Sequence, residues 1–133
     1  MKILIVDDDF ASRRILMKCA QSLGTCDMAA NGKEAMMAYE DALQEKDPYD
    51  LILLDIMMPE MDGNEVLKAI RDRESRAAPG TLRKTTIAMA SSLGDKQSII
   101  GSFHNQCDGY IVKPYSPDSL LRDLKRSGII SDQ

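Results

Sequence analysis

The sequence contains little of what most metal centres and many catalytic centres are made from. It has no tryptophan, one histidine (His104) and three cysteines. The cysteines, Cys19, Cys26 and Cys107, are scattered along the chain and show no C-x-x-C spacing. Because zinc sites gather several cysteine or histidine ligands at short spacings, no zinc site is expected. We expect reduced thiols that pack as small hydrophobic side chains.

Long hydrophobic runs and an excess of basic residues are also absent. No apolar run approaches the roughly 20 residues that a membrane-spanning helix needs. The first apolar stretch is short and is interrupted by Asp7, so it does not resemble a signal peptide. The formal net charge of −4 argues against a nucleic-acid-binding face, which would need many basic side chains. We therefore expect a cytoplasmic protein that binds neither membranes nor DNA directly.

The remaining composition is that of an ordinary globular domain. Of the 133 residues, 44% are hydrophobic and 29% are charged, which is enough to build one buried core. The expected organisation is one domain over residues 1–127 and a short tail over residues 128–133. No output domain is expected.

Four short apolar segments have the pattern of buried strands. They are residues 2–6, 51–54, 86–90 and 110–112. None of them alternates polar with apolar residues, as expected for a parallel sheet that is covered on both faces. A fifth and more polar segment, residues 25–29, is predicted to lie near the sheet edge.

Apolar residues at helical spacing predict a helix after each strand. The five stripes are Ile15, Leu16, Cys19, Ala20 and Leu23; Ala35, Met36, Tyr39, Ala42 and Leu43; Val66, Leu67 and Ile70; Ile99, Ile100 and Phe103; and Leu120, Leu121 and Leu124. Ser116 and Pro117 suit the N-cap and first position of the last helix. The alternation of strands with helices predicts an α/β fold with a parallel sheet and right-handed crossovers.

Polar residues follow the predicted strands, at the sheet edge where open α/β folds bind ligands. They are Asp7, Asp8 and Asp9 after the first strand, Asp55 after the third, Ser91 and Ser92 after the fourth, and Lys113 and Pro114 after the fifth. Clustered carboxylates repel one another unless a cation lies among them, and Mg²⁺ prefers such oxygen ligands. A carboxylate can also accept a phosphoryl group, whose charge Mg²⁺ and a lysine would neutralise. The sequence therefore predicts a magnesium-dependent phosphoacceptor site.

Four segments, in the same order along the chain, resemble the receiver domain of two-component response regulators. They are Ile5–Asp9, Leu53–Gly63, Ser91 and Gly109–Pro114. The resemblance extends from Lys2 to about Lys125, and the Asp-x-x-Met-Pro-x-Met-Asp-Gly motif is its most specific part. It implies a stand-alone, chemotaxis-receiver-like domain with a doubly wound, flavodoxin-like fold. Such a fold has five parallel strands in the order 2-1-3-4-5 and five flanking helices.

The resemblance implies roles for the residues around the phosphoacceptor. Asp55 matches the aspartate that is phosphorylated. Asp8 and Asp55 match the side-chain ligands of Mg²⁺, or of Mn²⁺ in its place, with Asp7 assisting through a water molecule. The backbone carbonyl of Met57 matches the remaining protein ligand. Lys113 matches the lysine that pairs with the phosphoryl group.

Other matching residues are implied to act in switching or in shaping the site. Ser91 matches the hydroxyl that contacts the phosphoryl group and moves when the domain switches, and Tyr110 matches the aromatic residue that follows it. Pro59 and Gly63 match the turn between the site and the third helix. Pro114 matches a proline whose peptide bond is usually cis in the family.

Each of these residues also has an ordinary structural explanation. The acidic residues after the first strand could cap the following helix, and Asp9 is expected to be only a cap or a surface charge. Taken alone, Lys113 would be a solvated lysine, Ser91 a turn residue or cap, and Tyr110 a core residue. The four segments in register favour the functional interpretation.

Two apolar residues are predicted to affect hydrolysis of the phosphorylated aspartate. In receivers, the positions of Met57 and Leu93 border the path of the attacking water. Neither side chain can orient that water by hydrogen bonding, so slow self-dephosphorylation is expected. Met36, Met37 and Met89 are instead expected to fill gaps in the core.

Two other functional classes would require different residues at this site. A phosphatase with an aspartyl-phosphate intermediate would carry a second aspartate where Met57 stands, so turnover of an external substrate is not expected. A degenerate receiver would normally have lost an acidic residue or the lysine. The connection Arg71–Lys84 is predicted to be a longer helix followed by a solvated loop, with partner binding as the alternative.

The expected phosphodonor is a sensor histidine kinase or a histidine phosphotransfer protein. After phosphorylation, the surface formed by the fourth helix, fifth strand and fifth helix would bind a downstream protein, or the phosphoryl group would be relayed. The same surface could support a weak homodimer of an otherwise monomeric domain.

Overall fold

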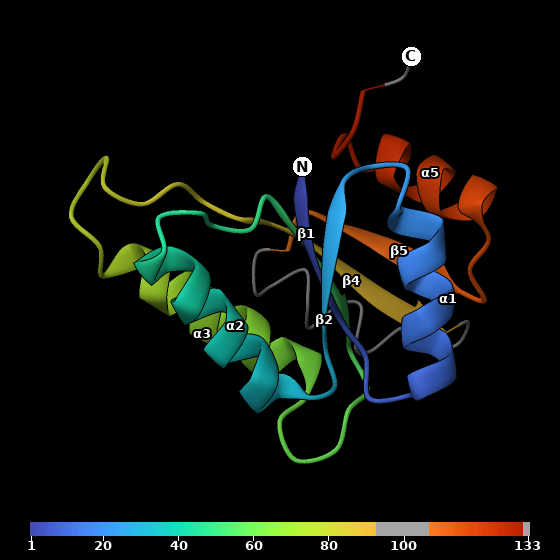
Figure 1. The fold of residues 1–133 in the computed structure, drawn as a ribbon, viewed down its shortest axis with the longest axis horizontal. Helices are drawn as coiled ribbons and strands as arrows, with labels where there is room; N and C mark the ends of the chain where they lie inside the picture. Colours follow the sequence, from blue (N-terminus) through green and yellow to red (C-terminus); the bar gives the residue numbers. More distant parts are fainter. Residues whose placement is uncertain (93–106, 132–133) are drawn as a thin grey trace.

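The computed structural model describes residues 1–92 and 107–131. Strands and helices alternate along these residues (Figure 1). The elements are β1 (Lys2–Val6), α1 (Phe10–Ala20), β2 (Thr25–Ala29), α2 (Gly32–Gln44), β3 (Leu51–Asp55), α3 (Gly63–Ser75), β4 (Thr86–Ser92), β5 (Gly109–Lys113) and α5 (Pro117–Arg126). The predicted helix around Ile99 and Phe103 lies outside the described residues, as does Leu93.

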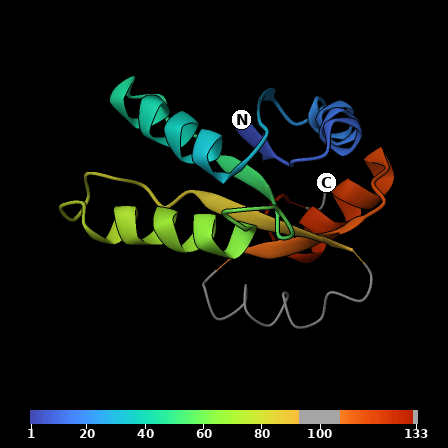
Figure 2. The same cartoon turned by 90° about the horizontal axis from the view of Figure 1, so that it is seen from below.

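The five strands form one parallel sheet in the order β2-β1-β3-β4-β5. Figures 1 and 2 show α2 and α3 side by side on one face of the sheet, with α1 and α5 on the other. The predicted doubly wound, flavodoxin-like architecture is therefore confirmed. Because every strand runs in the same direction, all of their carboxyl ends meet at one edge.

Each face of the sheet is covered by its own hydrophobic cluster. Leu4, Ile52 and Leu54 face α2 and α3, where they pack with Tyr39 and Ile70. Their neighbours along the same strands, such as Ile3, Ile5 and Leu53, face α1 and α5. Burial on both faces explains why these strands are continuously apolar rather than alternating.

Local side-chain caps determine where the helices begin. Asp9 caps α1 by accepting from Ser12 N at 3.1 Å, which confirms the predicted role of that aspartate. Ser116 caps α5, in which Pro117 is the first residue, as predicted. Asp62 forms a capping box with Glu65 at the start of α3.

Two predictions of buried apolar residues are wrong. Ile15 is 48% exposed and Met37 is 59% exposed. In α1 the adjacent Leu16 faces the sheet, and one residue along a helix turns the side chain by about 100°. Met37 likewise follows the half-buried Met36 and points away from the sheet. Helical spacing placed Ile15 at the margin of a stripe whose centre it identified correctly, whereas Met37 was expected only to fill a gap in the core.

The amino-end edge of the sheet contains a network of charged side chains. The Arg71 side chain, 9% exposed, donates to Glu74 Oε1 at 2.7 Å and to Asp108 Oδ2 at 2.9 Å. These acceptors also bind backbone groups, because Thr85 N donates to Glu74 Oε2 at 2.6 Å and Ile87 N to Asp108 Oδ2 at 2.8 Å. The predicted longer helix is confirmed to Ser75, and the following loop is mostly exposed, as predicted. Arg71, in the last turns of α3, belongs to the charged network.

Candidate functional site

Asp55 is the last residue of β3 and is only 3% exposed. It lies in the central strand of the sheet, and its backbone is in register with Ala90 of β4. β3 was predicted to span residues 51–54 and ends one residue later, at Asp55. A polar side chain does not prevent the backbone from pairing with the neighbouring strand. This register holds the carboxylate at the carboxyl-end edge, between β1 and β4.

Asp7 and Asp8 follow β1 directly and stand beside Asp55. Asp7 is 1% exposed, whereas Asp8 is exposed. Asp9 N donates to Asp7 Oδ1 at 2.9 Å, and Arg13 Nη1 donates to the Asp7 carbonyl at 2.7 Å. These two bonds fix the turn between β1 and α1, and Arg13 is a residue that the sequence analysis did not identify.

The three carboxylates form a group that fits a divalent cation. One oxygen from each of Asp7, Asp8 and Asp55 lies within 4.8 Å of the other two. Asp7 Oδ2 is buried and accepts no hydrogen bond among the residues that the structure describes. Hard oxygen ligands at this spacing, with an unused buried lone pair among them, suit Mg²⁺.

Lys113 is the last residue of β5 and brings an ammonium to the same cluster. Its Nζ lies 3.1 Å from Asp55 Oδ1 and 3.6 Å from Asp7 Oδ2. Burial lowers the pKa of Lys113, but the charges of Asp55 and Asp7 more than offset this and raise it above its ordinary value. The lysine is therefore a fixed positive charge at neutral pH.

The environment of Asp55 disfavours its charged form. Burial, followed by the charge of Asp7, raises the pKa of Asp55 from 3.8 to about 6, although Lys113 lowers it. The pKa values of both Asp55 and Lys113 are raised. At the Asp55 carboxylate, burial and repulsion from Asp7 therefore outweigh the attraction to Lys113. Asp55 is therefore mainly ionised at neutral pH, with less net stabilisation than a simple ion pair would provide.

Ser91 and Tyr110 lie on one face of the sheet near this cluster. Ser91 is 2% exposed, and its Oγ has no hydrogen-bond partner within residues 1–92 and 107–131. In the β4–β5 register, Ser91 pairs with Val112 and Met89 pairs with Tyr110, so all four side chains point to the α2–α3 face. The structure thus brings the two predicted switch residues onto the same side.

The turn after β3 is shaped by a close approach of two backbone segments. Gly63 N donates to the Ile56 carbonyl at 2.9 Å. A Cβ atom at Gly63 would collide with the Asp55 carbonyl oxygen, so only glycine fits there. Pro59 lies in the loop between them, and Glu60 adopts a positive φ of 67°. The loop thereby supports the backbone of Asp55.

The remaining predicted residues surround the cluster. Met57 is 62% exposed beside Asp55, while its neighbour Met58 is buried. The Lys113–Pro114 peptide bond is cis, as the resemblance implied. Tyr115, which the sequence analysis did not identify, packs against the hydrophobic cluster on the α1 side. Its position directly after Lys113-Pro114 was the only sequence signal for it.

Comparison with known proteins identifies the family. The response regulator receiver domain matches residues 3–125. The chain belongs to the response regulator receiver family. This receiver is 38% identical over 125 residues to the transcriptional regulatory protein ResD of Bacillus subtilis, covering 93% of this chain and 46% of ResD. The transcriptional regulatory protein SrrA of Staphylococcus aureus is 36% identical over 125 residues, which again cover 93% of this chain and 46% of SrrA. The receiver thus spans about half the length of these relatives.

Solved structures of receivers share its fold. The chemotaxis protein CheY4 of Vibrio cholerae is 29% identical with a TM-score of 0.74, covering 95% of this receiver and 97% of CheY4. The CheX–CheY–BeF3–Mg²⁺ complex from Borrelia burgdorferi gives 28% identity and a TM-score of 0.79, covering 98% of this receiver and 90% of that chain. These similarities agree with the receiver architecture that the sequence predicted.

Proposed function

We propose that this receiver accepts a phosphoryl group on Asp55 from a phosphohistidine partner in a Mg²⁺-dependent reaction. The observation that carries the proposal is the arrangement of Asp55, Lys113 and Ser91 at one edge of the sheet. A nucleophilic carboxylate, a fixed cation and a buried hydroxyl that has no hydrogen-bond partner within residues 1–92 and 107–131 lie there.

Transfer requires one bond to form and one to break. An Asp55 carboxylate oxygen attacks the donor phosphorus, the phosphorus–nitrogen bond breaks, and its electron pair returns to the donor imidazole. Lys113 Nζ pairs with one phosphoryl oxygen, and the Ser91 hydroxyl donates to another. Mg²⁺ held by Asp8, Asp55 and the Met57 carbonyl, with Asp7 behind a water molecule, would supply further positive charge. The domain therefore acts by positioning and charge neutralisation.

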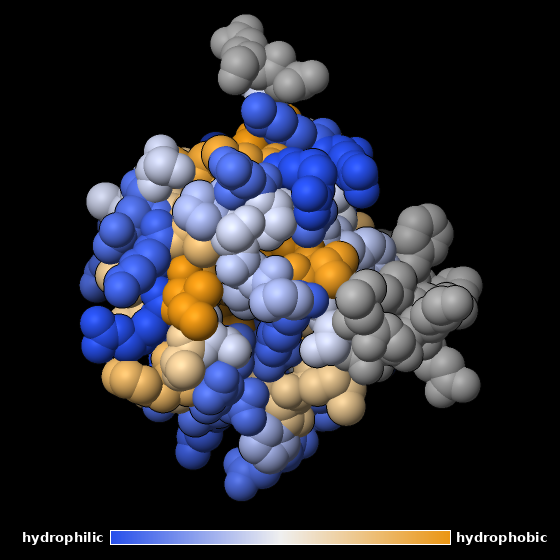
Figure 3. Space-filling model, turned by 90° about the vertical axis from the view of Figure 1, so that its right-hand side faces the viewer, coloured by the Kyte–Doolittle hydropathy of each residue, from blue (hydrophilic) through white to orange (hydrophobic). Residues whose placement is uncertain are grey.

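The surface beside the site is suited to a docking partner. A cavity of about 420 Å³ adjoins Lys113 and is also lined by Ser12, Ile15 and Tyr115. Phe10, at the first turn of α1, is 62% exposed. The face that α1 and α5 form is mostly hydrophilic, with separate hydrophobic patches (Figure 3). A kinase or phosphotransfer protein that covers these patches would exclude water from Asp55.

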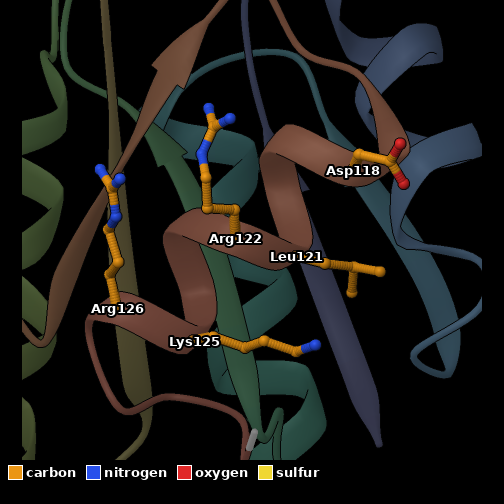
Figure 4. A pocket seen from close by; sticks show the side chains of 5 residues that line it. All are labelled: Asp118, Leu121, Arg122, Lys125 and Arg126. Carbon is orange, nitrogen blue, oxygen red and sulfur yellow. The ribbon is translucent and has the colours of Figure 1, made fainter.

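The phosphoryl group is proposed to control a second surface through Ser91 and Tyr110. When Ser91 bonds the phosphoryl oxygen, Tyr110 takes the space that it leaves on the same face of the sheet, and the surface of β5 and α5 changes. On α5, a hollow of about 510 Å³ is lined by Arg122, Lys125 and Arg126 (Figure 4). A downstream protein or a second receiver would bind this side, or the phosphoryl group would be relayed.

No described helix is long and apolar enough to cross a membrane. We place the domain in the cytoplasm, where a histidine kinase would present its phosphohistidine. We also propose that it does not turn over an external substrate. The division into a domain over residues 1–127 and a tail over residues 128–133 stays a prediction.

Intact-mass spectrometry after incubation with acetyl phosphate or a phosphohistidine protein tests the proposal. Wild-type protein with Mg²⁺ is expected to gain one phosphoryl group, and Asp55→Asn none. Asp41→Asn, an exposed aspartate on α2, is the matched control and should be phosphorylated as the wild type. Phosphorylation of Asp55→Asn, or none of the wild type from either donor, would contradict it.

A further inference from the structure

The hydroxyl of Tyr115 is buried without a hydrogen-bond partner among the described residues. Its ring packs against the hydrophobic cluster beneath α1, two residues after Lys113. A buried phenol normally finds a partner, because a buried donor without a hydrogen bond destabilises the folded state. The hydroxyl therefore requires an explanation that packing alone does not provide.

Asp7 has a buried acceptor oxygen that lacks a donor among the described residues. Its Oδ1 accepts a hydrogen bond from Asp9 N at 2.9 Å. Its Oδ2 lies 3.6 Å from Lys113 Nζ, is buried, and accepts no hydrogen bond in the part of the chain that the structure describes. One buried donor and one buried acceptor are thus both unused near the end of β1.

Tyr115 lies on the same side of the site as Lys113 and is affected by the charges of the acidic cluster. Burial raises the pKa of Tyr115, and the charges of Asp7 and then Asp55 raise it further. Tyr115 also lines the same cavity as Lys113, whose ammonium contacts both carboxylates. The phenol is therefore a neutral donor at the α1 side of the acidic cluster.

We propose that Tyr115 is a positioning residue for the metal site, whose O–H donates to the Asp7 carboxylate through one water molecule. The inference rests on the proposed function, because it concerns Mg²⁺ binding at the same cluster. Partners that orient a metal ligand typically contribute about 10-fold or more to metal affinity. By holding Asp7 Oδ2 in place, Tyr115 would prepare the carboxylate for the cation before it arrives.

Removing only the hydroxyl tests the inference, with Tyr39 as a matched control. Tyr39 is completely buried on the other face of the sheet, and its hydroxyl also has no partner among the described residues. In calorimetric titrations with Mg²⁺, Tyr115→Phe should raise the Kd about 10-fold, whereas Tyr39→Phe should leave it unchanged. At saturating Mg²⁺, phosphorylation of Tyr115→Phe by acetyl phosphate should return to the wild-type rate.

A double-mutant cycle with Asp7→Ala shows whether the hydroxyl acts through that carboxylate. Tyr115→Phe should have no further effect on Mg²⁺ affinity once Asp7 is removed. An unchanged Kd for Tyr115→Phe, an equal loss in Tyr39→Phe, or an additive cycle would overturn the inference and leave the phosphoacceptor proposal standing. If the wild type binds no Mg²⁺ at all, the proposed function fails as well.

Discussion

The two edges of the sheet each hold a buried cluster of charged side chains, and the clusters differ in how well they are paired. At the amino-end edge, the Arg71 guanidinium donates to Glu74 and Asp108, and both carboxylates also accept from backbone N–H groups. At the carboxyl-end edge, the carboxylates of Asp7, Asp8 and Asp55 lie together, and among the described residues the ammonium of Lys113 pairs with Asp55 and Asp7.

The difference in pairing indicates different roles for the two clusters. The paired cluster ties α3 to the beginnings of β4 and β5, and stabilises the fold. The unpaired cluster leaves Asp7 Oδ2 and Ser91 Oγ without hydrogen bonds among the described residues and raises the pKa of Asp55 to about 6. Buried polar groups kept in this state destabilise the protein, and binding of a cation and a phosphoryl group would satisfy them.

The largest expected effect is at the paired edge. Arg71→Ala removes the guanidinium that pairs with Glu74 and Asp108, and Asp108 keeps only the weaker contact of the Lys84 ammonium at 3.7 Å among the described residues. The free energy of unfolding should therefore fall by about 3 kcal/mol. Urea unfolding measures the change, and intact mass should show that the folded variant is still phosphorylated. Arg122→Ala on the exposed face of α5 is the control and should change stability little. A loss no larger than in this control would mean that the network is not stabilising.

Removing a charge at the carboxyl-end edge should stabilise the protein rather than destabilise it. Asp55→Asn eliminates the repulsion from Asp7, so in EDTA the variant should be more stable than the wild type by about 1–2 kcal/mol. The figure allows for solvent screening. Urea unfolding with and without Mg²⁺ measures the effect, and the cation should stabilise the wild type more than the variant. Destabilisation of Asp55→Asn in EDTA would contradict the comparison.

The same repulsion predicts a pH dependence. The folded-state pKa of Asp55 is about 6 and its ordinary value is 3.8, so the folded state binds this proton more tightly than the unfolded state. The penalty is complete above the folded-state pKa and is relieved as the pH falls through it, which adds about 1 kcal/mol of stability. The free energy of unfolding, measured in EDTA between pH 3.8 and about pH 6, should rise as the pH falls in the wild type and not in Asp55→Asn. Identical pH profiles would refute the assignment.

The smallest expected effect concerns the phosphoryl lifetime. Met57→Asn places a hydrogen-bonding side chain beside Asp55, where the exposed methionine cannot orient a water molecule. Hydrolysis should accelerate several-fold, on the order of 1 kcal/mol in the barrier. The decay of phosphorylated protein after removal of the donor measures it, with Met37→Asn on α2 as the control. An unchanged decay rate would count against slow hydrolysis as a property of Met57.

The sequence predicted the sheet and the main site residues because both depend on local patterns. Continuous apolar strands identified the parallel sheet, and the polar residues that end β1, β3, β4 and β5 meet at one edge by topology. Ile15 was placed wrongly because helical spacing does not define the margin of a buried stripe, and Met37 because a methionine beside a buried residue need not itself be buried. Arg71 was not recognised because its partner Asp108 is distant in sequence. Tyr115 was not recognised because only the folded chain brings its ring into the cluster on the α1 side.

The most direct test of the central claim is to locate the phosphoryl group after transfer from a phosphohistidine donor. Borohydride reduces an acyl phosphate, so phosphorylated aspartate becomes homoserine and can be found by peptide mass spectrometry. The account predicts homoserine at position 55, formed only with Mg²⁺ and absent when Lys113→Ala removes the ammonium. Homoserine at Asp7 or Asp8, or formation at Asp55 independent of both the cation and Lys113, would contradict it.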